Sequence, residues 1–150
     1  MKHSLPLRAL SRLLQYPDRE LMDHLSEVAA ALYEMPKLSK KVQVGLEEFV
    51  NNLEASDLMD SQENYVECFD RGRATSLHLF EHVHGDSRER GQAMVDLLQT
   101  YKEGGLQLSA NELPDHLSII LEFASTLPLD QAKQFVGEMA HILNAVYSTL

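Results

Sequence analysis

Apolar residues recur every three or four positions along nearly the whole chain, and Pro, Gly, Ser and Asp interrupt the pattern. No segment shows the strict alternation that is typical of β-strands. The pattern therefore predicts an all-α protein, a single-domain helical bundle of about eight helices that forms one domain over residues 1–150. The expected helices cover approximately residues 4–16, 18–35, 42–55, 65–70, 75–85, 86–103, 113–127 and 130–150.

Several of the interrupting residues are typical of helix ends. Asp18 follows a proline and can cap the second helix. Gly85 fits a left-handed C-terminal cap, and Asp86 with Glu89 resembles a capping box at the start of the next helix. Pro114 is expected at the first helical position of the helix that follows.

The last predicted helix has an apolar stripe that continues to Leu150 without fading. A chain end usually carries a cap and a few polar residues. We therefore expect the sequence to be truncated at its C-terminus, or a further packed segment to be missing.

Composition excludes several classes of protein. The chain has 150 residues, of which 44% are hydrophobic, and 13 Lys and Arg oppose 23 Asp and Glu, a net charge of −10. This charge repels phosphate backbones and anionic lipids, so neither nucleic acid binding nor stable membrane association is expected. The single cysteine, Cys68, excludes an internal disulfide and suits the cytoplasm. No apolar run approaches the roughly 20 residues that span a bilayer, and the N-terminus lacks a signal-peptide core.

His78, Glu81 and His82 match the pattern H-x-x-E-H, in which two histidines bind zinc and a glutamate activates water. On a helix the three side chains would share one side, so the spacing permits ligation. However, no third ligand motif follows. The pattern therefore leaves two interpretations, a zinc hydrolase and a polar helix face opposite the core.

Asp115 and His116 begin a helix with a very wide apolar arc, which we expect to be central in the bundle. An acid and an imidazole beside an apolar surface could bind a basic peptide that carries apolar anchors. The alternative is structural, because an acid near a helix N-terminus is favoured by the helix dipole and a histidine on an apolar face is often a core residue.

Tyr65 and Phe69 have helical spacing and lead into Asp70, Arg71 and Arg73. The aromatics could line a groove in which the acid meets a cation. Equally, helical aromatics are often core residues, and the two arginines could be solvated cations of a turn at the intervening glycine.

The segment from residue 65 to 98, YVECFDRGRATSLHLFEHVHGDSRERGQAMVDLL, closely resembles the signature of respiratory nitrate reductase assembly chaperones of the NarJ type. The segments LLQYPD at residues 13–18 and ELPDHL at residues 112–117 resemble the same family. This resemblance implies a cytoplasmic helical chaperone that is not an enzyme and holds no cofactor. Its expected client is the immature catalytic (alpha) subunit of a molybdenum nitrate reductase, bound through its N-terminal segment before cofactor insertion and membrane docking.

The resemblance also implies further partners and a set of site residues. Proteins that insert the cofactor are expected partners, and no residue is assigned as a metal ligand. The expected peptide-binding residues are Tyr65, Phe69, Asp70, Glu112, Asp115, His116 and Leu117. The expected family-signature residues are Arg71, Gly72, Arg73, His78, Glu81 and His82. From the sequence we expect a groove lined by Tyr65, Phe69 and Leu117, in which Asp70, Glu112 and Asp115 meet the basic residues of the peptide.

Overall fold

A computed structural model describes residues 5–35, 38–85 and 87–150. These residues form ten α-helices and one short 3-10 helix and contain no β-strand, which confirms the all-α prediction. The elements are α1 (Leu5–Leu13), α2 (Arg19–Asp23), α3 (Leu25–Leu32), α4 (Lys40–Ala55), α5 (Leu58–Phe69), η2 (Arg73–Thr75), α6 (Phe80–His84), α7 (Arg88–Glu103), α8 (Leu117–Ala124), α9 (Leu129–Gly137) and α10 (Ala140–Thr149).

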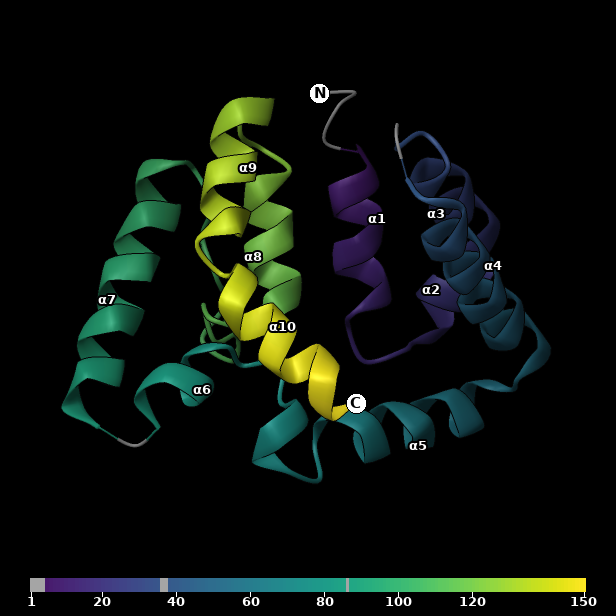
Figure 1. Ribbon diagram of the computed structural model, residues 1–150, viewed down its shortest axis with the longest axis horizontal. Coiled ribbons are helices and arrows are strands. Elements are labelled where there is room, and N and C mark those ends of the chain that lie inside the picture. Colours follow the sequence, from purple (N-terminus) through teal and green to yellow (C-terminus); the bar gives the residue numbers. More distant parts are fainter. Residues whose placement is uncertain (1–4, 36–37, 86) are drawn as a thin grey trace.

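Helices α1 and α8 lie side by side at the centre of the molecule (Figure 1). Helices α2, α3 and α4 pack on one side of this pair, and α6 and α7 lie on the other. All residues of α8 except Glu122 are buried, as expected for a helix with so wide an apolar arc. The central position predicted for this helix is therefore confirmed.

Three apolar clusters fill the interior. The first joins α1 to α2, α3 and α4. The second lies between α8, α10 and the non-helical segment at residues 77–79. The third packs α7 against α8 and includes Tyr101, which is fully buried and donates a hydrogen bond of 2.7 Å from its hydroxyl to the carbonyl oxygen of Pro114. Burial of these side chains is the main stabilising contribution to the fold.

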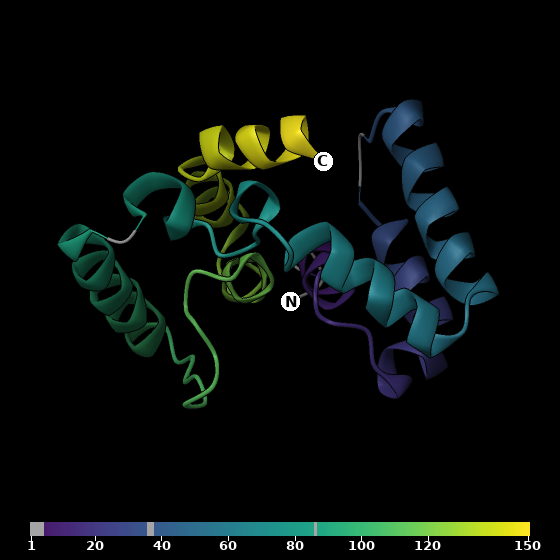
Figure 2. The same cartoon turned by 90° about the horizontal axis from the view of Figure 1, so that it is seen from below.

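Helix α5 runs below α1 and the lower end of α4 (Figure 1), so it lies in front of α1 when the molecule is seen from below (Figure 2). It begins at Leu58, whereas the sequence pattern indicated a polar connection over residues 56–61. The earlier start has a local cause, because the side chain of Asp57 accepts a hydrogen bond of 2.9 Å from the backbone N–H of Asp60.

Three of the predicted helices are interrupted. The helix expected over residues 18–35 divides at His24, which has non-helical dihedral angles. The one expected over residues 75–85 contains a non-helical stretch at residues 76–79, with a β-bridge at His78 and a turn at Leu79, and becomes α-helical only at Phe80. The last one divides between α9 and α10, so that α9 packs against α8 while α10 packs against η2.

The cap signals had mixed outcomes. Asp18 caps α2 as predicted, accepting a hydrogen bond of 2.8 Å from the backbone N–H of Leu21. Gly85 ends α6 with a φ of 56°, a positive value that favours glycine, but its ψ of −124° is not that of the predicted left-handed cap. Pro114 lies before α8 rather than at its first position, because His116 is the N-cap. Asp86 lies outside the described residues. No helix in the described part of the chain is both long and apolar enough to cross a bilayer.

Candidate functional site

Two segments that are far apart in the sequence, residues 77–79 and 115–117, form hydrogen bonds with each other beside α8. The backbone N–H of Leu117 donates to the carbonyl oxygen of Leu77 at 2.9 Å, and that of Leu79 donates to the carbonyl oxygen of Asp115 at 3.1 Å. These bonds form one antiparallel β-bridge. Leu77 and Leu79, on either side of His78, are both buried and belong to the second apolar cluster. The pairing fixes His78, the residue between them, against the N-terminus of α8.

Asp115 lies inside the molecule, with none of its surface exposed. Its Oδ2 accepts a hydrogen bond of 3.0 Å from the backbone N–H of Phe80, the first residue of α6. Its Oδ1 lies 3.5 Å from His78 Nδ1. This carboxylate raises the pKa of His78, while burial of the imidazole opposes the change. Asp115 therefore positions the segment before α6, and its carboxylate does not reach a surface on which a peptide could bind.

His116 forms the N-cap of α8. Its Nδ1 accepts a hydrogen bond of 3.2 Å from the backbone N–H of Ser118, so this nitrogen carries no proton. Its Nε2 lies 3.4 Å from the hydroxyl oxygen of Tyr65, which itself donates to the carbonyl oxygen of Leu14. Burial, together with the nearby His78, lowers the pKa of His116 to about 4. The imidazole is therefore neutral at physiological pH and acts as a structural cap.

An aromatic row runs across this region. The ring of Tyr65 meets Tyr16 edge to face at a centroid distance of 5.7 Å and Phe69 at 5.1 Å. Burial of Tyr65, with the negative charge of Asp70 nearby, raises the pKa of its hydroxyl to about 12. The Tyr65 side chain is therefore uncharged, and it is held in place by its ring contacts with Tyr16 and Phe69 and by its hydrogen bond to Leu14.

On one side of Tyr65 lies a cleft of about 400 Å³, which we call the acidic cleft. It is lined by Gln15, Tyr16, Tyr65, Asp70, His78, Asn111, Glu112, Leu113, His116, Ser118, Ile119 and Glu122. Four of the expected peptide-binding residues meet here, namely Tyr65, Asp70, Glu112 and His116. The fold thus brings together side chains from α5, α8 and the connection that precedes α8.

The other three expected peptide-binding residues do not line this cleft. Leu117 is buried in the second apolar cluster, and Asp115 is buried behind the cleft. Phe69 lies on the opposite side of Tyr65 and lines a different, apolar hollow. For Asp115 the physical reason is that α8 begins only at Leu117, so the helical projection used for residues 113–116 does not apply to it.

The cleft also contains residues that the sequence analysis did not select. Glu122 is the single charged residue of α8, and Ile119 lies one turn before it. A lone charge in so apolar a helix was a usable signal, because it must face solvent or a polar partner. Tyr16 and Leu113 are both exposed apolar residues beside predicted sites, and only the fold shows that they share this cleft.

Three residues of the expected family signature, Arg71, Gly72 and Arg73, form an exposed turn after α5. Gly72 has a φ of −155°, an extended conformation that any residue adopts, so its backbone does not require glycine. Arg71 lines a hollow that shares Tyr16 with the acidic cleft. The prediction of a turn at these residues is confirmed.

The three residues of the H-x-x-E-H pattern contact different partners. His78 faces Asp115, while Glu81 lies 3.6 Å from the guanidinium of Arg90. His82 Nε2 is 2.8 Å from the carbonyl oxygen of Ser76. His78 precedes α6, so the shared helix face assumed for the zinc interpretation does not form. Across the described residues, no three His, Cys, Asp or Glu side chains are grouped so that they could hold a metal ion.

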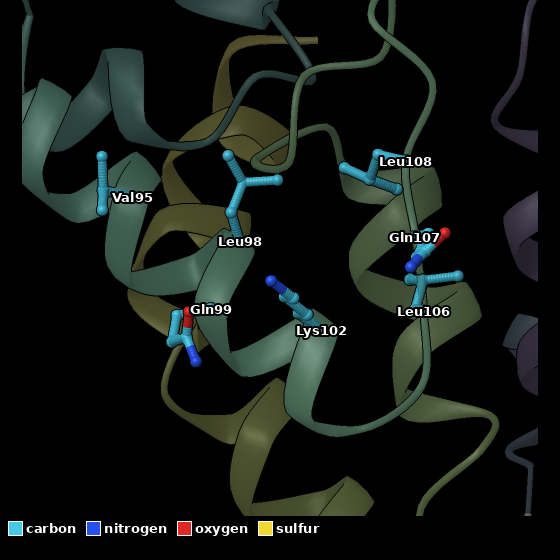
Figure 3. Close-up of a pocket in the computed structure, with 7 residues that line it drawn as sticks. All are labelled: Val95, Leu98, Gln99, Lys102, Leu106, Gln107 and Leu108. Carbon is cyan, nitrogen blue, oxygen red and sulfur yellow. The ribbon is translucent and has the colours of Figure 1, made fainter.

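A further hollow of about 360 Å³ lies between α7 and the segment that follows it, and it shares no lining residue with the acidic cleft (Figure 3). It is lined by Val95, Leu98, Gln99, Lys102, Leu106, Gln107 and Leu108. None of the expected site residues is among them. This hollow therefore provides a comparison surface for experiments on the cleft.

Comparison with known proteins identifies the family. The model of the family described as "Nitrate reductase delta subunit" matches residues 34–148. The chain belongs to the nitrate reductase delta subunit family. The NarJ-type resemblance found in the sequence is therefore confirmed.

Relatives in this family carry chaperone names. The nitrate reductase molybdenum cofactor assembly chaperone NarJ of Escherichia coli K12 is 50% identical over 134 residues, which cover 89% of this chain and 57% of the relative. NarW of the same strain, assigned to the same role, is 48% identical over 91% of this chain and 56% of its own length. A Bacillus subtilis relative assigned as NarJ is 32% identical over 83% and 67%. The chain thus spans little more than half the length of its Escherichia coli relatives.

A solved structure shows the same fold. The crystal structure of a protein from Archaeoglobus fulgidus, assigned as a redox enzyme maturation protein, superposes with a TM-score of 0.63 at 24% identity. The match covers 93% of this chain and 82% of the other. At this identity the comparison supports the arrangement of the helices and carries no functional argument.

Proposed function

We propose that this chain is an assembly chaperone for a molybdenum nitrate reductase and that it is not an enzyme. Its client is the immature catalytic (alpha) subunit, whose N-terminal segment binds in the acidic cleft before cofactor insertion and membrane docking. Family membership and the names of the relatives support the general role. The placement of the client segment in the cleft is supported by the charge and shape of the cleft.

Charge is the observation that carries this proposal. Asp70, Glu112 and Glu122 supply three carboxylates to the cleft, while no Lys or Arg is among the described residues that line it. Ile119 and Leu113 supply apolar surface beside them. Carboxylates next to apolar surface suit a segment that combines cationic residues with apolar anchors, and the net charge of −10 attracts such a segment from a distance.

Hydrogen bonds behind the cleft support a preformed binding surface. Asp115 and His116 hold the segments at residues 77–80 and 115–118 through partly buried hydrogen bonds to the backbone. Because these bonds fix the backbone on which the cleft residues stand, little conformational entropy is lost on binding. Their role is positioning.

Isothermal titration with a synthetic peptide of the client N-terminal segment tests the proposal. The double variant Glu112→Gln plus Glu122→Gln removes two charges but keeps a side-chain oxygen at each position. The new amide oxygen can therefore still accept the hydrogen bond of 3.0 Å that the Glu112 carboxylate accepts from the backbone N–H of Ser109. We expect affinity to fall about tenfold, equivalent to about 1.4 kcal/mol. Added salt should weaken wild-type binding in the same direction.

The matched control is Asp130→Asn plus Glu138→Gln, two exposed acids of α9 and its C-cap that are absent from the cleft. It makes the same change in net charge at a different place. Equal loss of affinity in both double variants would show a diffuse charge effect and would contradict a defined site. No measurable binding to the wild-type chain would overturn the proposed function itself.

A further inference from the structure

A second hollow lies on the other side of Tyr65, and we call it the apolar groove. It has a volume of about 410 Å³ and lies where α5 crosses α1 and α4 (Figure 2). It is lined by Leu13, Leu14, Pro17, Leu21, Phe49, Asn52, Leu53, Ser56, Ser61, Asn64, Tyr65, Cys68 and Phe69. None of these residues carries a charge, in contrast to the acidic cleft.

The groove leaves apolar surface in contact with water. Phe49 is 44% exposed, whereas Leu53, one turn later on the same face of α4, is almost buried. The phenyl ring thus stands at the rim of a hollow whose floor consists of leucine and aromatic side chains. A ligand that covers this surface would remove apolar area from water, which is favourable.

The charges on the α4–α5 side of the groove have one sign. Residues 42–70, which form nearly all of α4 and the whole of α5, contain no Lys or Arg. Their acidic residues are Glu47, Glu48, Glu54, Asp57, Asp60, Glu63, Glu67 and Asp70. A second copy of this chain, with its net charge of −10, would be repelled here. The complementary ligand is a segment with apolar side chains for the groove and positive charges for its surroundings.

Tyr65 connects the groove to the acidic cleft, because its ring lines both. In the aromatic row, Tyr16 belongs to the cleft and Phe69 to the groove, with Tyr65 between them. A ligand in the cleft and a ligand in the groove would therefore both contact Tyr65.

We propose that the apolar groove binds the apolar side chains of the same client segment whose cationic residues bind in the acidic cleft. This inference rests on the proposed function and deepens it, because it names the residues that contact the apolar side chains of the client. These residues are Phe49, Leu53 and Phe69 on the α4–α5 side of the molecule. The two surfaces then form one continuous site on which charge and apolar contact are separated by Tyr65.

Cys68 offers a direct readout of the groove. It is the single cysteine of the chain, it is exposed, and it lines the groove but not the cleft. Ellman's reagent therefore reports on the accessibility of this one thiol. At saturating client peptide, we expect the rate of Cys68 modification in the full chain to fall at least tenfold. An unchanged rate under conditions where calorimetry shows a bound peptide would overturn the inference.

A variant provides a second, independent measurement. Phe49→Gln changes an exposed side chain, so the fold should be retained, and circular dichroism checks this. We expect its affinity for the peptide to fall about tenfold. The control is Val95→Gln, which changes an exposed apolar residue of the α7 hollow (Figure 3) and should leave affinity unchanged. Equal affinity of the folded Phe49→Gln variant and the wild type would contradict the proposal.

The outcomes separate the two levels of the argument. Peptide binding without protection of Cys68 overturns the groove assignment and leaves the proposed function intact. No peptide binding at all overturns both. Protection of Cys68 in the absence of peptide, accompanied by a dimer in light scattering, would show that a second copy occupies the groove and would overturn the assignment to the client.

Discussion

Replacement of Asp115 tests whether the site depends on a buried carboxylate that holds α6 and His78 in place. In the variant Asp115→Ala, the backbone N–H of Phe80 loses its 3.0 Å acceptor and His78 Nδ1 loses the negative charge 3.5 Å away. Asp115→Asn is the matched comparison, because its amide oxygen can still accept from Phe80 while the charge is absent.

The magnitude follows from these contacts. An unsatisfied donor in a largely buried position costs about 1–3 kcal/mol. Truncation of a side chain with no exposed surface also leaves a cavity, which costs about 24 cal/mol for each Å³ that the surrounding residues do not fill. Relief of the buried charge offsets part of this. We therefore expect Asp115→Ala to lower the free energy of unfolding by about 2–4 kcal/mol, and Asp115→Asn by roughly half as much.

The two variants should also differ in pH dependence. The Asp115 carboxylate raises the pKa of His78 above its ordinary value of 6.5. The resulting stabilisation is fully present below pH 6.5 and is lost as the pH rises through the folded-state pKa. Asp115→Asn should therefore cost more at about pH 5.5 than at about pH 8.5. Urea denaturation at both values measures this difference, and NMR titration should show a lower pKa of His78 in the variant.

Two results would refute the reasoning. If Asp115→Ala unfolds with a free energy within about 0.5 kcal/mol of wild type, the carboxylate does not hold the segment before α6. If the pKa of His78 is the same in wild type and Asp115→Asn, the ion pair between the two side chains does not form in solution.

Three further predictions concern stability. In Gly104→Ala the new methyl group would lie 2.5 Å from a ring carbon of buried Phe123. We therefore expect the free energy of unfolding, measured by urea denaturation, to fall by about 1–3 kcal/mol. The control Gly91→Ala places its methyl group in open space on α7 and should raise this free energy by about 0.5–1 kcal/mol. Tyr101→Phe leaves a buried carbonyl without its donor and should lower the thermal midpoint, with a cost of about 1–2 kcal/mol. The pKa of His116 is lowered to about 4, so its contribution to the free energy of unfolding is present above pH 6.5 and is lost as the pH falls toward 4. In His116→Asn the free energy of unfolding should therefore change less between pH 6.5 and 4 than in the wild type. An unchanged slope of free energy against pH would exclude His116 as its source.

Local signals in the sequence were sufficient for the helical class and for several helix ends. The i, i+3, i+4 spacing places apolar residues on one face of a helix whatever its neighbours are, and Asp18 and Gly85 act within one turn of the backbone. The central position of α8 could also be predicted, because a helix with apolar residues on most sides must be surrounded. The resemblance to the NarJ-type family was likewise carried by the residues alone.

The breaks in the helices and the composition of the site could not be predicted in this way. The segment at residues 76–79 has helical spacing, but its backbone hydrogen bonds to residues 115–117, almost 40 positions later, replace helical ones. The same pairing turns Asp115 inward and makes His116 a cap. Both residues were expected on a helix, and the helix begins after them.

The sequence by itself thus determined the helical class, the family to which the chain belongs and its net negative charge, because these properties depend on local spacing, on residue identity and on the sum of charges. Only the tertiary structure decided that Tyr65 separates an acidic cleft from an apolar groove and that Asp115 supports the cleft from inside. Such placements depend on contacts between distant segments, such as Tyr65 with Leu14 and Asp115 with Phe80, whose energies compete with local preference and here outweigh it.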